Sequence, residues 1–241
     1  MIPAASLILV REAGDAPEYL MVERSPAMAF AAGATVFPGG RIDPEDEELA
    51  LGDPADAAKV AAIRECIEES AVAAGLDPPP SPEQARSIQD SLLDGQKFAQ
   101  ILERQRLALN LSTLTCFARW QPGPEVSRRF DTIFFVAKAP EGEWVPNAAS
   151  GECVAARWVS AKAILDEEVR GVTKLIFPTR KTLERLALHD NFAAILADAR
   201  KHPAAPITPV IEAADGVDYI RIPDGLGYPV TRDPLTAKIR G

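Results

Sequence analysis

Short apolar or alternating runs, separated by turn residues, predict a series of core β-strands along the first two thirds of the chain. Gly14 and Asp15 lie between the first two runs and are typical of a hairpin turn. The predicted strands cover residues 4–10, 18–23, 35–37, 113–120, 128–138 and 152–159. Helical patterns lie among these strands, an order that permits an α/β fold.

The clearest helical pattern follows residue 53, where apolar residues recur at spacings of three and four. Asp53 suits the N-cap, Pro54 suits the first helical position, and Gly75 is predicted to end the helix. The apolar stripe consists of Val60, Ile63, Ile67, Ala71 and Ala74.

Further helices are predicted after a Pro-rich break at residues 77–82. Residues 82–109 carry a broken apolar stripe, and this helical segment either caps a substrate cleft or packs on the core. Residues 160–168, 178–188 and 191–201 also show helical patterns. The tail, residues 203–241, is rich in Pro and Gly and predicts a surface hairpin, with strands at 208–213 and 219–222, and a mobile end.

Composition indicates a globular protein of 241 residues, with 47% apolar and 25% charged residues, enough for one domain with a full core. The net charge of −9 disfavours a nucleic acid polymer as partner. Cys66, Cys116 and Cys153 are widely spaced, which fits apolar filling in a reducing compartment. Because no signal peptide or membrane span is evident, we expect a cytoplasmic protein without a membrane partner. A homodimer is compatible with the sequence.

Candidate chemistry gathers on the helix that follows residue 53. At 100° per residue, Glu65, Glu68 and Glu69 lie on roughly the opposite side from the apolar stripe. Carboxylates this close repel one another, and a divalent cation such as Mg²⁺, which prefers oxygen ligands, removes that cost. The alternative is an ordinary solvated face of a Glu-rich helix.

This segment resembles the Nudix box, in which a Gly, five residues, a Glu and seven residues precede Arg-Glu-apolar-x-Glu-Glu-x-Gly-apolar. The matching residues are Gly40, Arg64, Glu65, Cys66, Glu68, Glu69 and Val72. Asp46 stands where the box has its first Glu, and Ala71 replaces the late Gly. About ten residues are inserted between Gly40 and Arg64, and we expect this acidic insertion to be a surface loop.

The segment upstream, LMVERSPAMAFAAGATVFPGG, resembles a second motif that marks the coenzyme A diphosphatase branch of the same family. The residues at matching spacings are Leu20, Arg24, Ser25, Gly33, Phe37, Pro38, Gly39 and Gly40. Ala29 replaces the second Arg of that motif, and Val22 replaces its Thr. The sequences of this segment and of residues 128–135, RRFDTIFF, are most similar to those of peroxisomal acyl-coenzyme A diphosphatases.

The resemblance implies an α/β/α sandwich with a mixed sheet, forming a single Nudix hydrolase domain over residues 1–241. Residues 77–112 are then a helical insertion, 160–202 the C-terminal helices and 203–241 a tail. The implied reaction is hydrolysis of a diphosphate linkage in a small nucleotide, favouring coenzyme A or acyl-coenzyme A. The implied cofactor is Mg²⁺ or Mn²⁺, held by Glu65, Glu68 and Glu69, while Arg64 braces the loop and helix. Hydrolysis of ADP-ribose or dinucleotides, and a non-catalytic ligand sensor, remain open.

Candidate substrate contacts lie around this box. Gly39 and Gly40 allow a sharp turn toward the metal site. Arg24 contacts either a phosphate or an acidic neighbour. Arg128 and Arg129 begin a predicted strand, where they meet an anionic substrate or are merely solvated.

One more carboxylate outside the box is expected as a metal ligand or base. Glu152, which precedes the RWVS strand, is the first candidate, with Glu143 and Glu125 as rivals. The default for each is an exposed structural Glu.

Overall fold

The structure is a computed structural model that describes residues 1–123, 130–148, 151–214 and 216–235. Within these residues a mixed eight-stranded sheet has the order β10-β7-β8-β1-β2-β3, with β4 paired to β1 and β9 paired to β2. β1 is parallel to β8 and β10 to β7, and the other pairs are antiparallel. The strands are β1 (Ile2–Ala13), β2 (Ala16–Arg24), β3 (Thr35–Val36), β4 (Gly39–Arg41), β7 (Thr115–Trp120), β8 (Phe130–Lys138), β9 (Cys153–Ser160) and β10 (Pro206–Ile207).

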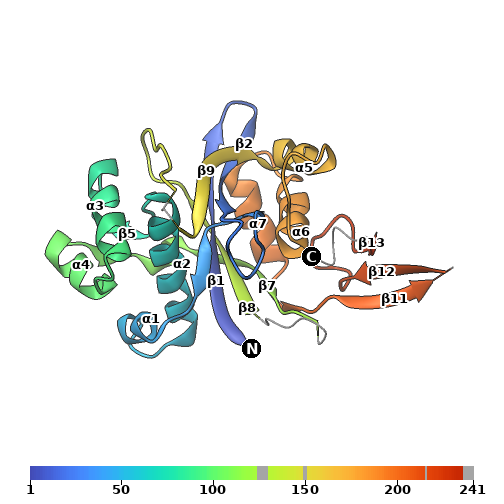
Figure 1. The fold of residues 1–241 in the computed structure, drawn as a ribbon, viewed down its shortest axis with the longest axis horizontal. Helices are drawn as coiled ribbons and strands as arrows, with labels where there is room; N and C mark the ends of the chain where they lie inside the picture. The colour runs from blue at the N-terminus through green and yellow to red at the C-terminus, as the bar shows by residue number, and fades with distance from the viewer. Residues whose placement is uncertain (124–129, 149–150, 215, 236–241) are drawn as a thin grey trace.

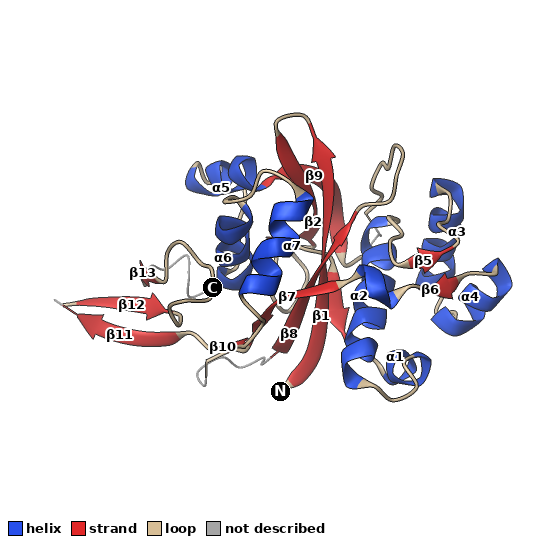
Figure 2. Ribbon diagram, turned by 180° about the vertical axis from the view of Figure 1, so that it is seen from behind, coloured by secondary structure: helices blue, strands red, loops and turns tan. Residues whose placement is uncertain are grey.

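Helices cover both faces of this sheet (Figures 1 and 2). Leu7 and Leu9 of β1 pack toward α2, whereas the alternating residues Ile8 and Val10 pack toward α6 and α7, as the two-residue period of a strand requires. The first layer holds α1 (Pro44–Leu49), α2 (Pro54–Ser70), α3 (Pro82–Leu93) and α4 (Phe98–Gln105), and the second holds α5 (Ala161–Val169), α6 (Phe177–Leu186) and α7 (Phe192–Lys201). The predicted α/β/α sandwich with a mixed sheet is therefore confirmed.

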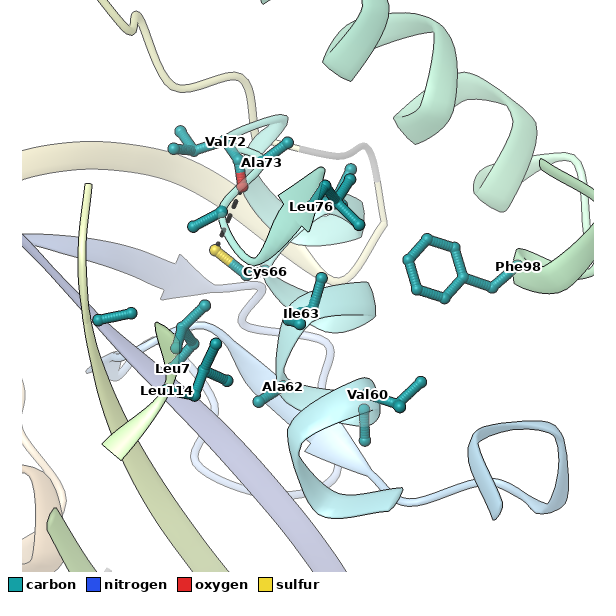
Figure 3. Packing of buried hydrophobic residues seen from close by; sticks show 14 of the residues in the cluster. Leu7, Val60, Ala62, Ile63, Cys66, Val72, Ala73, Leu76, Phe98 and Leu114 are labelled. Carbon is teal, nitrogen blue, oxygen red and sulfur yellow. Dashed lines mark hydrogen bonds between the residues drawn. The ribbon is translucent and has the colours of Figure 1, made fainter. Parts of the chain in front are cut away.

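Cys66 illustrates the packing between α2 and its neighbours (Figure 3). Its side chain is fully buried beside Ile63 and Val72, and the thiol donates to the Val72 carbonyl oxygen at 3.4 Å. Burial raises the pKa of this thiol to about 12, so it stays protonated at neutral pH. Cys66 thus fills the core as expected, and Cys153 is also buried, whereas Cys116 is exposed.

Helix α2 begins as predicted but ends early. The Asp53 carboxylate accepts from the backbone N–H groups of Ala55 and Asp56, at 2.8 and 3.1 Å. The last helical residue is Ser70, and Ala71 takes a left-handed conformation with φ of 54°. The expected end at Gly75 is therefore wrong, because the chain already turns where the Nudix box has its Gly.

The insertion before Arg64 is not a plain surface loop, which corrects the prediction. It contains the short helix α1, and Asp46 of that helix is fully buried. The Asp46 carboxylate accepts from the Asp43 backbone N–H at 2.9 Å and faces α2. The turn that follows is exposed, since Leu51 keeps 96% of its surface accessible.

The predicted helical segment 82–109 is two helices, α3 and α4, separated at Gly95, which has φ of 75°. Short strands β5 (Leu76–Asp77) and β6 (Ala108–Leu109) pair at its base, followed by η1 (Leu111–Thr113). Ile88 of α3 and Ile101 of α4 belong to the same buried apolar cluster as the residues of α2. The division of the chain into 77–112, 160–202 and 203–241 stays a prediction.

The tail forms a separate three-stranded sheet of β11 (Val210–Ala214), β12 (Val217–Arg221) and β13 (Arg232–Pro234), which projects from the body (Figure 1). The expected surface hairpin is present as β11 and β12, but the following part of the tail, up to residue 235, is docked, which corrects the expected mobile end. Ile222, Tyr228 and Asp233 are each less than 9% exposed, and the fully buried Lys181 of α6 pairs with Asp233. No helix in the described part of the chain combines the length and apolarity that a membrane crossing needs.

Candidate active site

The site is built where the Gly39–Gly40 turn meets the C-terminal half of α2. Strand β4 pairs with β1, so that Gly40 lies opposite Ala5 and the turn is fixed to the sheet. A Cβ atom on Gly40 would lie 2.5 Å from Oε1 of Glu65. The backbone N–H of Gly39 donates to Oε2 of Glu69 at 2.9 Å. A Cβ atom on Gly39 would clash with the Ala5 carbonyl oxygen, so both positions favour Gly, one against the Glu65 carboxylate and one against β1.

Glu69 is buried, which corrects the expectation that all three carboxylates lie on an open face. Its residue is 3% exposed, and its Oε1 accepts from the Cys153 thiol at 3.4 Å. Nη1 of Arg24 lies 3.8 Å from the same oxygen. The buried carboxylate therefore has three polar neighbours: a backbone N–H group, a thiol and a guanidinium. Burial raises the pKa of Glu69 to about 7.

Glu65 and Glu68 are half-buried on the same side of α2. Burial raises the pKa of Glu65 to about 8, and the neighbouring Glu69 and Glu68 carboxylates add to this rise. Burial also raises the pKa of Glu68, with the Glu152 carboxylate contributing. The site thus concentrates negative charge that its own cations do not fully balance.

Arg64 holds the insertion against α2. Its Nε and Nη2 donate to the two carboxylate oxygens of Asp46 at 2.9 and 2.8 Å, a bidentate pair. Its Nη2 also donates to the carbonyl oxygen of Arg41 at 3.1 Å. Its Nη1 donates to Glu65 at 2.9 Å and lies 3.6 Å from Glu68. These contacts are those expected of a residue that braces loop and helix.

The remaining predicted residues divide into three groups. Glu152 is exposed, yet its charge reaches Glu68 and Glu69, while its carbonyl oxygen accepts from the Ser25 backbone N–H at 2.7 Å. Glu143 is exposed on the segment between β8 and β9. The predicted residues Arg128, Arg129 and Glu125 lie outside the described part of the chain.

The donor set fits a divalent cation of the hard, oxygen-preferring kind. Burial opposes the ionisation of Glu65, Glu68 and Glu69. The Glu68 and Glu69 carboxylates act electrostatically on Glu65, and the Glu152 carboxylate acts on Glu68 and Glu69. Within the described residues, no three His, Cys, Asp or Glu side chains already surround one point. The contacts explain this, because Arg64 engages Glu65 while Glu69 is held by the Gly39 N–H group.

Comparison with solved structures identifies the fold. The chain matches the crystal structure of a NUDIX hydrolase from Alicyclobacillus acidocaldarius with a TM-score of 0.71 and 29% identity, covering 82% of this chain and 96% of that one. The chain has the fold of a Nudix hydrolase, and this likeness supports a place in the Nudix superfamily. It supports hydrolysis of diphosphate linkages in general, a reaction for which Nudix hydrolases generally use divalent metal ions.

Weaker matches include a C. elegans Ap4A hydrolase, with a TM-score of 0.45 and 16% identity over 82% of this chain and 98% of that one. A MutT NUDIX hydrolase from Burkholderia pseudomallei matches with a TM-score of 0.43 and 18% identity, over 76% of this chain and 95% of that one. No family model and no curated protein matches this chain.

Sequence reasoning missed several groups of this Nudix site. Gln89 of α3 and Asn147 of the segment before β9 both contact the end of α2. Cys153 contacts Glu69 across 84 positions of sequence, and no local pattern signals such a contact. The box spacing did align Asp46 with the first Glu, and its pairing with Arg64 is the observation that supports that alignment.

Proposed function

We propose that this Nudix hydrolase cleaves the diphosphate linkage of a nucleoside diphosphate derivative in a reaction that needs Mg²⁺ or Mn²⁺. The favoured substrate is coenzyme A or acyl-coenzyme A, giving adenosine 3′,5′-bisphosphate and phosphopantetheine or its acyl form. The observation that carries the proposal is the set of three α2 carboxylates against the Gly39–Gly40 turn, with the charge of Glu152 within reach.

Glu65, Glu68, Glu69 and Glu152 would hold the cation. When bound, a divalent cation neutralises the diphosphate and acidifies the attacking water for in-line displacement at phosphorus. Gly39 and Gly40 keep the backbone close to the carboxylates, leaving no side chain between them. Arg64 does not contact substrate in this scheme, because Asp46 and Glu65 already engage its guanidinium.

Arg24 contributes to diphosphate binding in this proposal. Its Nε donates to the Phe30 carbonyl oxygen at 3.3 Å, and its Nη1 lies 3.8 Å from Glu69. An arginine held beside the metal-binding helix meets the reacting diphosphate, so the 3′-phosphate of coenzyme A requires another cation. Arg128 and Arg129 remain the candidates for that role.

The reaction class is tested by phosphate-ester analysis of products with and without Mg²⁺ or Mn²⁺. We expect turnover only with metal, and Glu69→Gln should remove most of it while the fold is kept, since the change deletes a charge at constant volume. Metal-independent turnover, or none on any diphosphate, would refute the proposal and favour the sensor alternative.

Substrate choice is tested on coenzyme A, 3′-dephospho-coenzyme A and ADP-ribose. We expect coenzyme A to be the best of the three. Arg24→Ala should slow coenzyme A and its dephospho form by the same factor, about ten- to a hundredfold for a charge-assisted contact of 1.5–3 kcal/mol. Faster turnover of ADP-ribose would overturn the coenzyme A assignment and leave the diphosphatase chemistry standing.

A further inference from the structure

The last turn of α2 carries Glu68 and Glu69, and its backbone carbonyls need partners from outside the helix. The final four carbonyl groups of any α-helix lack intrahelical donors. Here the Ala71 N–H satisfies the Ile67 carbonyl oxygen at 2.8 Å, but Ala71 then turns the chain away in the left-handed conformation. The carbonyl oxygens of Glu68 and Ser70 therefore have no donor within the helix.

A side-chain amide and a backbone N–H group from outside the helix donate to these two carbonyls. Nε2 of Gln89, in α3, donates to the Glu68 carbonyl oxygen at 2.9 Å. The backbone N–H of Asn147 donates to the Ser70 carbonyl oxygen at 2.7 Å. The end of the metal-binding helix is therefore closed by the helical insertion and by the segment that leads to β9.

Gln89 and Asn147 also bind each other reciprocally. Nε2 of Gln89 donates to the Asn147 carbonyl oxygen at 2.9 Å, and Nδ2 of Asn147 donates to Oε1 of Gln89 at 2.8 Å. Gln89 is 1% exposed, and both N–H groups and the oxygen of its amide have partners. A buried amide used this completely holds three elements in one arrangement.

We propose that Gln89 and Asn147 are positioning residues for the metal site. They fix the final turn of α2, with Glu68 and Glu69, relative to the segment that brings Glu152 to the same site. The proposal rests on the proposed function of these carboxylates as metal ligands. It gives the α3–α4 insertion a role besides packing. The Gln89 amide, which contacts the helix that carries the metal ligands, limits how far the end of α2 can fray.

The test combines Mn²⁺ binding by calorimetry with amide hydrogen exchange at the end of α2, in wild type, Gln89→Leu and Asn147→Ala. Gln89→Leu removes the amide at similar volume, and Asn147 is exposed, so its substitution is tolerated by the fold. Ser91→Ala is the matched control, because its buried hydroxyl donates to the Ser87 carbonyl oxygen and accepts from Arg104, both within the insertion.

We expect Gln89→Leu to bind Mn²⁺ about tenfold or more weakly, the range found for outer partners of metal ligands. Asn147→Ala keeps its backbone bonds to Ser70 and Gln89 and loses only the Nδ2 bond, so we expect it to weaken Mn²⁺ binding by a smaller factor. Exchange of the Ala71 amide should quicken in both variants, and Ser91→Ala should change neither quantity. Wild-type Mn²⁺ affinity and wild-type exchange of the Ala71 amide in a folded Gln89→Leu variant would overturn this inference but not the proposed metal site. If Gln89→Leu does not fold, the same result in Asn147→Ala would do so. Mn²⁺ affinity that Glu69→Gln leaves unchanged would overturn the proposed metal site and the inference with it.

Discussion

Removing the carboxylate of Asp46 should destabilise the protein strongly, although Asp46 belongs to a short helix in an insertion. Asp46 is fully buried and accepts from Nε and Nη2 of Arg64 at 2.9 and 2.8 Å. It also accepts from the Asp43 N–H at 2.9 Å. The Arg64 side chain is 11% exposed, and Asp46→Ala leaves its guanidinium without its main partner.

The magnitude follows from these contacts. Deleting one partner of a buried ion pair typically costs about 3–5 kcal/mol. Arg64 keeps Glu65 at 2.9 Å, which compensates part of the loss and favours the lower end, about 3 kcal/mol. For a chain of this length that corresponds to a fall in Tm of about 6–12 °C.

Thermal and urea unfolding of Asp46→Ala measure the loss, with Glu45→Ala as control. Glu45 lies next to Asp46 but pairs with Lys97 at 3.0 Å in an exposed contact, which contributes little to stability because solvent screens it. If the two variants lost the same stability, the Asp46–Arg64 pair would not hold the insertion to α2, and the reasoning would be refuted.

Three further predictions concern other parts of the molecule. Ala71→Gly should raise the free energy of unfolding by about 1 kcal/mol, because Ala71 has φ of 54°; a loss in urea unfolding would contradict this. Lys181→Met should cost about 3 kcal/mol, because the buried Asp233 loses its nearest cation and keeps Arg180 at 3.6 Å, and it should speed limited proteolysis of residues 222–235; unchanged cleavage would argue against a docked tail. Gly40→Ala should cut metal-dependent turnover at least about tenfold, as expected when a ligand is displaced, because its Cβ meets Glu65; a fully active variant would show that the turn can relax.

The sequence by itself determined the local elements and the chemical character of the site. The start of α2 follows from Asp53 and Pro54, whose capping effects act within one turn. The two-residue period of a strand places Leu7 and Leu9 on the opposite face of β1 from Ile8 and Val10. The spacing of the box glutamates placed them on one region of α2, because helical geometry depends on sequence distance alone.

The tertiary structure decided which of these groups are buried and what they contact. Glu69 lies against Gly39 and Cys153, Asp46 against Arg64, and Gln89 against Asn147. Each of these pairs joins elements separated by at least 18 positions, so no periodicity or capping pattern encodes it. The same holds for the early end of α2 at Ala71. Local propensity favours Gly at such a left-handed position, but here donors from two distant segments bind the last carbonyl oxygens of the helix and stabilise the turn.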